Sequence, residues 1–285
     1  MTALHIAEVP VALLAGGLAT RLRPITETIP KAMVEVAGRP FIDHQLDLLN
    51  RNGIRRVVMC LGYRAEQVER HVGDGSARGM EICYAYDGEK LLGTGGAVRR
   101  VVLCVGYLGE MLRDHLGDGS RFGMELTYAF DGPNLLGTGG AIRRALPLLG
   151  ETFWVMYGDS YMDIDYRAVL DQFDRSAADA LMTVLRNGNR WDRSNVVFRD
   201  GRLLRYDKKV QTPEMDYIDY GVALLRREAA ERIPHDRPFD LAELYTQLVA
   251  EGKMIGYEVT NRFYEIGTPA ALEEAARYLA AARPG

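Results

Sequence analysis

The chain has 285 residues, of which 47% are hydrophobic and 26% are charged, and its formal net charge at pH 7 is −4. This composition is typical of a globular protein, and the length suits one large α/β domain or two small ones. The net negative charge argues against a general nucleic-acid binder, and no apolar run approaches the ~20 residues that cross a membrane. The N-terminal segment also lacks the basic start and apolar core of a secretion signal. We therefore expect a cytoplasmic protein without membrane or nucleic-acid partners.

The first predicted element is a short buried strand, and a loop of small residues follows it. Residues 11–14 form an apolar run of strand length. The loop and its exit contain small and basic residues: Gly16, Gly17, Ala19, Thr20, Arg21, Arg23 and Lys31. Successive small residues allow backbone N–H groups to approach an anion closely, and the cations add positive charge. The pattern predicts a polyphosphate-binding loop, with a tight strand-to-helix turn and solvated arginines as the alternative.

A tandem duplication follows. Residues 57–100 (copy one) and 101–144 (copy two) align without a gap at an offset of 44, and 27 of the 44 aligned positions are identical. Each copy has the pattern strand, helix, strand, glycine-rich turn and helix start, which is a βαβ-like unit. Without one copy the chain would have 285 − 44 = 241 residues. We therefore predict a single domain over residues 1–285 in which one copy is extra.

Three arrangements of the copies are open. In the first, one copy fills the place that a single copy would take in the fold, and the other loops out. In the second, a hybrid takes its first strand from copy one and its glycine turn from copy two. In the third, two chains exchange copies as a swapped dimer. Continuity favours copy two for the glycine turn, because only copy two is followed by a full helix, at residues 141–149.

Two carboxylates stand at turns further along the chain. Asp159 follows the predicted strand 153–157 in a Gly-Asp turn. Ligands of open α/β sheets bind at the carboxyl ends of the strands, so we expect Asp159 to face the small-residue loop. A carboxylate beside a polyphosphate predicts Mg²⁺ as the cofactor, with an ordinary turn as the alternative. Glu265 precedes the final helix, where stabilisation of the helix N-terminus is its alternative role.

Residues 9–33 read VPVALLAGGLATRLRPITETIPKAM. This stretch resembles the signature of the sugar-phosphate nucleotidyltransferases (nucleotide-sugar pyrophosphorylases), L-A-G-G-x-G-T-R-L-x-P-x-T followed by P-K, with Ala19 where glycine is usual. The E-I-G-T-P run that starts at Glu265 resembles the family's late D-x-G-T-P turn, with glutamate where aspartate is usual. The resemblance implies an α/β fold with a Rossmann-like doubly wound, mostly parallel mixed sheet, into which a duplicated βαβ-like segment is inserted.

The run L-L-G-T-G-G-A, at residues 91–97 and again at 135–141, stands where this family contacts the nucleobase. In this form it is most similar to the heptose-1-phosphate and mannose-1-phosphate guanylyltransferases, with muramic-acid-type uridylyltransferases near by. The resemblance implies transfer of a nucleotidyl group from a nucleoside triphosphate, with GTP favoured, to a sugar 1-phosphate, and release of pyrophosphate. A heptose or mannose 1-phosphate is the expected acceptor, and a GDP-sugar for cell-surface polysaccharide is the expected product.

The resemblance also implies roles for residues of this chain. Catalytic roles are expected of Arg21 and Lys31, which would neutralise phosphate charge, and of Asp159, which would hold Mg²⁺. The residues expected to bind the nucleotide are Leu14, Ala15, Gly16, Gly17, Leu18, Ala19, Thr20, Asp131, Gly137, Thr138 and Gly139. Those expected to hold the sugar phosphate are Asn195, Asp207, Lys208 and Gly221, and those expected to bind Mg²⁺ are Asp159 and Glu265. From the residues alone, a plain turn at Asp131 and a solvated hairpin around Lys208 remain alternatives.

Such a reaction requires no general base, because the acceptor phosphate is already an anion at neutral pH. Catalysis then consists of alignment and charge neutralisation. Two other functions stay open: a nucleotide or NDP-sugar binding or regulatory protein with weak or no catalysis because of the duplication, and an obligate swapped oligomer with an occluded site. We expect a monomer or homodimer, and domain swapping through the repeat is open.

Overall fold

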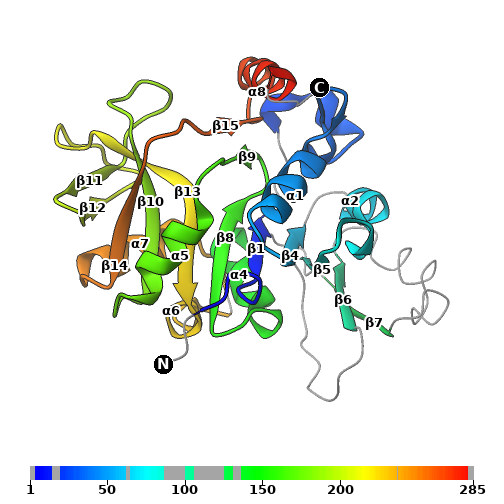
Figure 1. Ribbon diagram of the computed structural model, residues 1–285, viewed down its shortest axis with the longest axis horizontal. Helices are drawn as coiled ribbons and strands as arrows, with labels where there is room; N and C mark the ends of the chain where they lie inside the picture. The colour runs from blue at the N-terminus through cyan, green and yellow to red at the C-terminus, as the bar shows by residue number, and fades with distance from the viewer. Residues whose placement is uncertain are drawn as a thin grey trace.

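The computed structural model (Figure 1) describes residues 4–14, 20–61, 65–86, 100–105, 125–130, 136–235 and 237–281. Its centre is a nine-stranded sheet with the order β12-β11-β13-β8-β1-β4-β5, in which β10 pairs with β13 and β14 pairs with β10. The strands are β1 (Val11–Leu14), β4 (Arg56–Leu61), β5 (Glu81–Tyr86), β8 (Thr152–Tyr157), β10 (Ala180–Arg186), β11 (Val196–Arg199), β12 (Arg202–Tyr206), β13 (Tyr217–Arg226) and β14 (Met254–Val259). β8, β1, β4 and β5 run parallel, whereas β13 is antiparallel to β8. The prediction of an α/β fold with a mixed sheet is confirmed.

The two central strands are apolar along their length, as strands covered on both faces usually are. All four residues of β1 are buried, and β8 is buried up to its last residue, Tyr157. The register aligns Leu14 with Tyr157 on one side and with Cys60 on the other. The carboxyl ends of β1, β4 and β8 therefore meet at one edge of the sheet.

Helices cover both faces of the sheet, as in a doubly wound fold. Side chains alternate along a strand, so Val11 and Leu13 join one apolar cluster while Ala12 and Leu14 join another. The first cluster includes residues of α1, α2 and α5, and the second includes residues of α4, α6 and α7. These helices are α1 (Phe41–Arg51), α2 (Ala65–Val72), α4 (Gly137–Ala145), α5 (Tyr166–Asp174), α6 (Arg227–Glu231) and α7 (Leu241–Ala250).

Short elements attach the C-terminal segment to the end of β8. β15 (Tyr264–Glu265) pairs with β9 (Ser160–Tyr161), and α8 (Pro269–Ala281) packs with α1 in a third apolar cluster. The remaining short elements are η1 (Thr20–Leu22), η2 (Ile25–Glu27), η3 (Lys31–Met33), β2 (Glu35–Val36), β3 (Arg39–Pro40), η4 (Ser76–Arg78) and η6 (Leu146–Leu148). None of the described helices has the length and apolarity to span a bilayer.

Elements of both copies contribute to the structure. β4 and β5 of copy one belong to the nine-stranded sheet, whereas β6 (Arg100–Val105) and β7 (Glu125–Phe130) pair only with each other in a separate parallel sheet. β6 lies next to β5, beyond the edge of the main sheet (Figure 1). The helix α4, which begins in the glycine turn of copy two, packs on β1, β4 and β5. Strands from copy one and a helix from copy two therefore build the same part of the fold.

Candidate functional site

The candidate site lies at the edge of the sheet where β1 and β8 end. The backbone N–H of Gly158 donates to the carbonyl of Leu14 at 2.6 Å, so the turn that carries Asp159 begins beside the end of β1. Leu14 is the last residue of β1, and Thr20 opens the short helix η1 that contains Arg21. The other residues of the predicted loop, Ala15, Gly16, Gly17, Leu18 and Ala19, lie outside the described residues, as does Asp131.

Lys31 and Asp159 form an ion pair across 128 positions of sequence. Lys31 opens η3 directly after Pro30, and its Nζ donates to Oδ2 of Asp159 at 2.6 Å. Oδ1 of Asp159 accepts a hydrogen bond from the hydroxyl of Ser160 at 3.2 Å. The side chain of Lys31 is 13% exposed and that of Asp159 is 33% exposed, so a ligand could reach the carboxylate.

The pairing of β15 with β9 brings Glu265 to the same turn. Glu265 lies opposite Ser160 in this pair. The backbone N–H of Ile266 donates to the carbonyl of Asp159 at 2.9 Å, which fixes the two segments against each other. Residues more than a hundred positions apart in the sequence therefore become neighbours.

Positive and negative charges surround Glu265. Burial is the main cause that raises its pKa above the ordinary value, and the charge of Asp159 raises it further, while Lys31 and Arg21 act in the opposite direction. Gly267 allows Arg21 to approach, because a Cβ there would lie 3.2 Å from Oε1 of Glu265 and 3.4 Å from Nη2 of Arg21. The structure thus brings together four of the predicted site residues.

Two adjacent carboxylates suit Mg²⁺, which proteins often hold by one or two carboxylates and substrate phosphates. Within the described part of the chain, no group of three or more His, Cys, Asp or Glu side chains is placed to hold a metal. Phosphate and water would supply further ligands. The raised pKa of Glu265 reflects its burial and the charge of Asp159, and a bound cation would offset both. Asp159 and Glu265 therefore fit such an ion.

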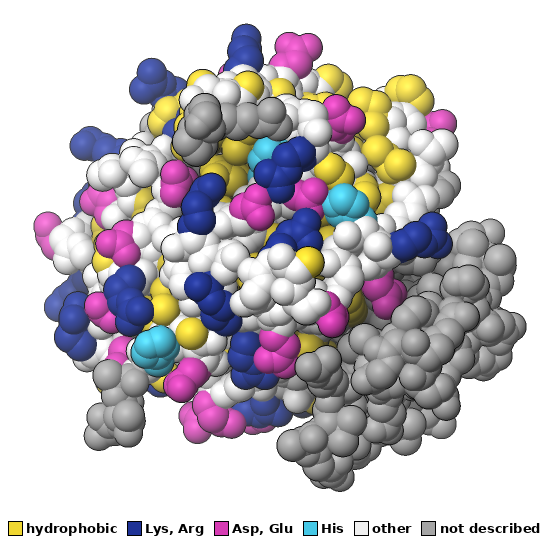
Figure 2. Space-filling model, turned by 45° about the vertical axis from the view of Figure 1, so that its right-hand side comes forward, with side chains coloured by type: hydrophobic (Ala, Val, Ile, Leu, Met, Phe, Trp, Pro, Cys, Tyr) yellow, Lys and Arg dark blue, Asp and Glu magenta, His cyan; other side chains and the backbone are white. Residues whose placement is uncertain are grey.

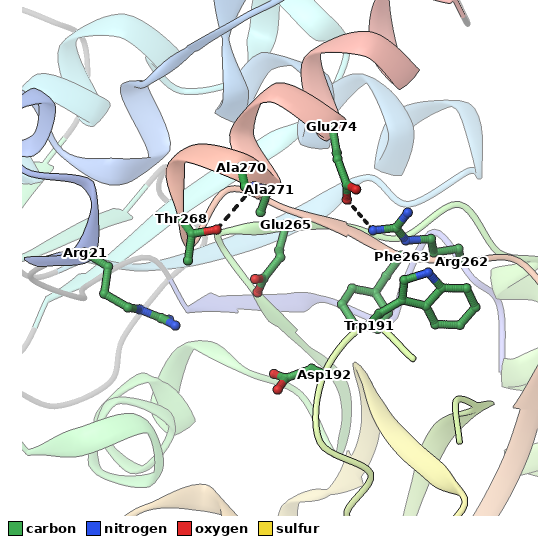
Figure 3. Close-up of a pocket in the computed structure, with 10 residues that line it drawn as sticks. All are labelled: Arg21, Trp191, Asp192, Arg262, Phe263, Glu265, Thr268, Ala270, Ala271 and Glu274. Atoms are coloured by element: carbon green, nitrogen blue, oxygen red, sulfur yellow. Dashed lines mark hydrogen bonds and ion pairs between the residues drawn. The ribbon is translucent and has the colours of Figure 1, made fainter. Parts of the chain in front are cut away.

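A cavity of about 320 Å³ opens beside Glu265 (Figure 3). Its lining residues are Arg21, Trp191, Asp192, Arg262, Phe263, Glu265, Thr268, Ala270, Ala271 and Glu274. Figure 3 shows Arg21 and Glu265 pointing into the cavity, with Asp192 on the side opposite Glu265. A cation and two carboxylates thus face a space large enough for part of a substrate.

Ring and polar contacts connect the residues of the far wall of this cavity. The guanidinium of Arg262 lies over the ring of Trp191, 5.4 Å from its centroid, and forms an ion pair with Glu274 of α8. At the start of α8, the hydroxyl of Thr268 accepts from the N–H of Ala271 at 3.2 Å. A helix N-terminus favours negative charge near by, whereas Arg262 on this wall is already paired with Glu274.

A second group of predicted residues lies beside Tyr157, at the end of β8. Nζ of Lys208 is 3.4 Å from the hydroxyl of Tyr157 and 5.4 Å from its ring centroid. Gly221 adopts φ +94°, and a Cβ there would lie 3.3 Å from Cδ2 of Tyr157. Burial acts to lower the pKa of Lys208, but Tyr157 and nearby Asp219 and Asp240 raise it above the ordinary value. Lys208 therefore remains a cation at neutral pH.

The other two predicted sugar-phosphate residues, Asp207 and Asn195, accept hydrogen bonds from backbone N–H groups. The Asp207 carboxylate accepts from the N–H groups of Lys209 (2.8 Å) and Val210 (2.9 Å), which closes the turn after β12 and lowers the pKa of Asp207. Oδ1 of Asn195 accepts from the N–H of Asp219 at 2.9 Å. These contacts give both side chains a structural role, and their contact with a sugar stays a prediction.

The glycine turn of copy two packs against the start of α7. The N–H of Gly139 donates to the carbonyl of Phe239 at 2.9 Å. The hydroxyl of Thr138 accepts from the N–H of Leu241 at 2.9 Å and donates to Oδ1 of Asp240 at 3.2 Å. A Cβ on Gly137 would lie 2.8 Å from the carbonyl oxygen of Phe239. Close packing accounts for the small residues of this turn, and nucleotide contact stays a prediction for them.

We expect Gly139→Ala to lower the free energy of unfolding by about 1–3 kcal/mol, the range usual for overpacking. The added Cβ would lie 2.6 Å from Cδ1 and 2.9 Å from the carbonyl oxygen of Phe239. Urea denaturation measures the change. Gly150→Ala is the control, because a Cβ there meets nothing closer than 3.8 Å. Unchanged stability together with a tenfold weaker nucleotide affinity would instead indicate direct nucleotide contact at Gly139.

Gln45 supports the site but is absent from the predicted residues. It lies in α1 with no exposed surface, and its Nε2 donates to the carbonyls of Ser160 (2.8 Å) and Tyr157 (3.2 Å). These two hydrogen bonds hold the turn that presents Asp159. A glutamine among the buried, mostly apolar residues of α1 was the available signal in the sequence.

Comparison with known proteins gives a family and a fold. A mannose-1-phosphate guanylyltransferase of Mycobacterium tuberculosis is 28% identical over 266 residues, which cover 92% of this chain but only 62% of that protein. An N-acetylmuramate alpha-1-phosphate uridylyltransferase of Caulobacter vibrioides is 27% identical over 272 residues, covering 90% of this chain and 91% of that protein. The chain thus spans less than two thirds of the mycobacterial relative and most of the Caulobacter one.

Among solved structures, a UDP-glucose pyrophosphorylase of Acinetobacter baumanii matches with a TM-score of 0.68 at 15% identity, covering 97% of this chain and 94% of that chain. This likeness shows the shared fold. The family model described as Nucleotidyl transferase matches residues 11–107 and 96–282, which include Arg21, Lys31, Asp159 and Glu265. The chain therefore belongs to the Nucleotidyl transferase family.

Proposed function

We propose that this protein transfers a nucleotidyl group from a nucleoside triphosphate to a sugar 1-phosphate and releases pyrophosphate. The observation that carries the proposal is the meeting of Arg21, Lys31, Asp159 and Glu265 at the carboxyl ends of β1 and β8, beside a cavity of about 320 Å³. Two cations and two carboxylates suit a reaction in which phosphate charge must be neutralised. The names of the mannose-1-phosphate and muramate-1-phosphate relatives support the same reaction class.

Each side chain has a role in this reaction. Arg21 and Lys31 neutralise charge on the triphosphate, and Lys208 holds the acceptor phosphate in line with the reacting phosphorus. Mg²⁺ held by Asp159 and Glu265 would supply charge neutralisation at the phosphates. The acceptor phosphate attacks the α-phosphorus, the bond to the β-phosphate breaks, and pyrophosphate leaves with the bonding electron pair. Because the attacking oxygen is already anionic, no side chain needs to remove a proton.

We propose GTP as the nucleotide and mannose or heptose 1-phosphate as the acceptor. The L-L-G-T-G-G-A run of copy two and the similarity to a mannose-1-phosphate guanylyltransferase support this choice. The similarity to an N-acetylmuramate alpha-1-phosphate uridylyltransferase makes UTP with an amino-sugar phosphate the main alternative. Both choices lead to a nucleotide sugar.

The test is pyrophosphate release with Mg²⁺ in a matrix of GTP, UTP, CTP, ATP and dTTP against mannose, glucose, heptose and N-acetylmuramic acid 1-phosphates. One strong combination would identify base and sugar together. Nucleotide binding by calorimetry without pyrophosphate release in any combination would contradict the proposal and indicate a binding or regulatory protein.

We expect Lys208→Met to raise the KM for the sugar 1-phosphate by roughly 10- to 100-fold, the cost of one charge-assisted hydrogen bond. The KM for the nucleotide should change less than about twofold, because Lys208 lies beside Tyr157 rather than beside Asp159. Lys209→Met is the matched control, since Lys209 is the adjacent lysine and is likewise exposed. Steady-state kinetics with each substrate varied in turn measures both constants. A selective rise in the nucleotide KM would place Lys208 at the triphosphate instead.

A further inference from the structure

We propose that the buried carboxylate of Asp43 selects which copy of the duplicated segment packs beside β1. Copy one supplies a hydrogen-bond donor to this carboxylate at Arg78, and copy two has no donor at the equivalent position. One chain thus chooses between two segments that share 27 of 44 residues, whether or not the proposed reaction is correct.

Asp43 lies in α1 and is held by two residues of copy one. Its side chain is only 8% exposed. Nη2 of Arg78 donates to Oδ1 of Asp43 at 2.5 Å, and Nε2 of His71 lies 2.9 Å from Oδ2. Asn50, also of α1, donates from Nδ2 to the carbonyl of Arg78 at 2.7 Å. A buried carboxylate needs such partners, because burial without them is costly.

The sequence of copy two lacks these donors. At the offset of 44, His71 corresponds to His115, but Arg78 corresponds to Phe122. Gln67, whose Nε2 donates to the carbonyl of Thr28 at 3.1 Å, corresponds to Met111. Neither phenylalanine nor methionine donates a hydrogen bond. Copy two in this position would leave Asp43 with the histidine alone.

The strand registers and the buried apolar positions of the two copies correspond. β4 pairs with β5 in the register Arg56↔Glu81, and β6 pairs with β7 in the register Arg100↔Glu125, which is the same register moved by 44 positions. Buried apolar residues of copy one have apolar counterparts of similar size in copy two: Met59 and Leu103, Val68 and Leu112, Ile82 and Leu126. Such exchanges are usually tolerated. The polar contacts of Arg78 and Gln67 are therefore contacts of copy one that copy two lacks the side chains to make.

Cys83 provides a built-in reporter, because its counterpart in copy two is Thr127. Cys83 lies on β5 and packs against the cluster that includes α4. Burial raises the pKa of its thiol to about 11, with a smaller contribution from Glu81 that Arg56 opposes. A buried thiol reacts slowly with alkylating reagents, and a thiol released to solvent reacts faster.

The experiment measures alkylation of Cys83 by iodoacetamide at pH 8 in the full chain, with Cys60→Ala and Cys104→Ala so that Cys83 is the only thiol. In this parent we expect slow labelling. The exchange variant carries Arg78→Phe together with Phe122→Arg. In most of its molecules Cys83 should be alkylated at least tenfold faster than in the parent. The midpoint of thermal unfolding should stay close to that of the parent. Phe122→Arg alone should give two populations, one slow and one fast.

A matched exchange one position earlier serves as the control. Ala77 is exposed and corresponds to Arg121, so Ala77→Arg with Arg121→Ala should leave labelling slow. Slow labelling in the Arg78/Phe122 exchange variant would overturn the proposal. Loss of folding in that variant would overturn it as well, because copy two with an arginine should then be able to replace copy one.

Discussion

Asp159→Asn is expected to lower turnover by more than about 100-fold, the loss typical of a preorganised charge at a reacting phosphate. Asp159 is paired with Lys31 at 2.6 Å and lies beside Glu265 through the β9–β15 pair. The amide is neutral, so it would bind Mg²⁺ weakly and would leave the ammonium of Lys31 without its partner. Pyrophosphate release at saturating substrates measures the effect.

Asp163→Asn is the matched control for this variant. Asp163 is an exposed residue of the same segment, four positions after Asp159. The turnover of the Asp163→Asn variant should stay within about twofold of that of the parent protein. Circular dichroism checks that both variants fold. If Asp159→Asn keeps near-normal turnover while folded, Asp159 has no part in catalysis.

Lys31→Met distinguishes a catalytic pair from two independent charges. The test combines Lys31→Met with Asp159→Asn in one double variant. If Lys31 and Asp159 act as a unit on the phosphates, this double variant should lose little more turnover than Asp159→Asn alone. If the losses of turnover in the two single variants add up in the double variant, Lys31 and Asp159 act independently in catalysis despite their ion pair. The side chain of Lys31 is only 13% exposed, so Lys31 is not simply a solvated surface lysine.

The architecture followed from sequence because it depends on local patterns, and the same patterns predict where the candidate site lies. The apolar run at residues 11–14 is too short for a helix and too apolar for a surface strand, and it is β1 at the middle of the sheet. Asp159 and Lys31 each stand next to a recognisable motif, and the carboxyl ends of parallel strands bring such motifs together. Their contact at 2.6 Å agrees with that expectation.

Side chains that bind backbone were harder to assign from sequence. An aspartate before a lysine looks like a substrate-binding pair, yet the Asp207 carboxylate caps its own turn through Lys209 and Val210. Whether a polar side chain satisfies the chain or a ligand depends on turn geometry that residue types do not specify. Gln45 shows the converse: its hydrogen bonds to Ser160 and Tyr157 join segments more than a hundred positions apart.

The two ways of removing the extra 44 residues are expected to give chains of very different stability. Deleting residues 87–130 or residues 57–100 leaves 285 − 44 = 241 residues in each case. The first deletion keeps residues 57–86 of copy one, including Arg78, and joins them to the glycine turn that packs on Phe239. It should therefore fold, and it should keep the turnover of the full chain.

The second deletion keeps only copy two, which has phenylalanine in place of the arginine that donates to Asp43. Removing one partner of a buried ion pair commonly costs about 3 kcal/mol or more, so we expect this chain to unfold at correspondingly lower urea. Phe122→Arg in the second chain should restore most of the difference, because it returns a donor to the buried carboxylate. Equal stability of the two deletion chains, or no rescue by the arginine, would show that Asp43 does not distinguish between the copies.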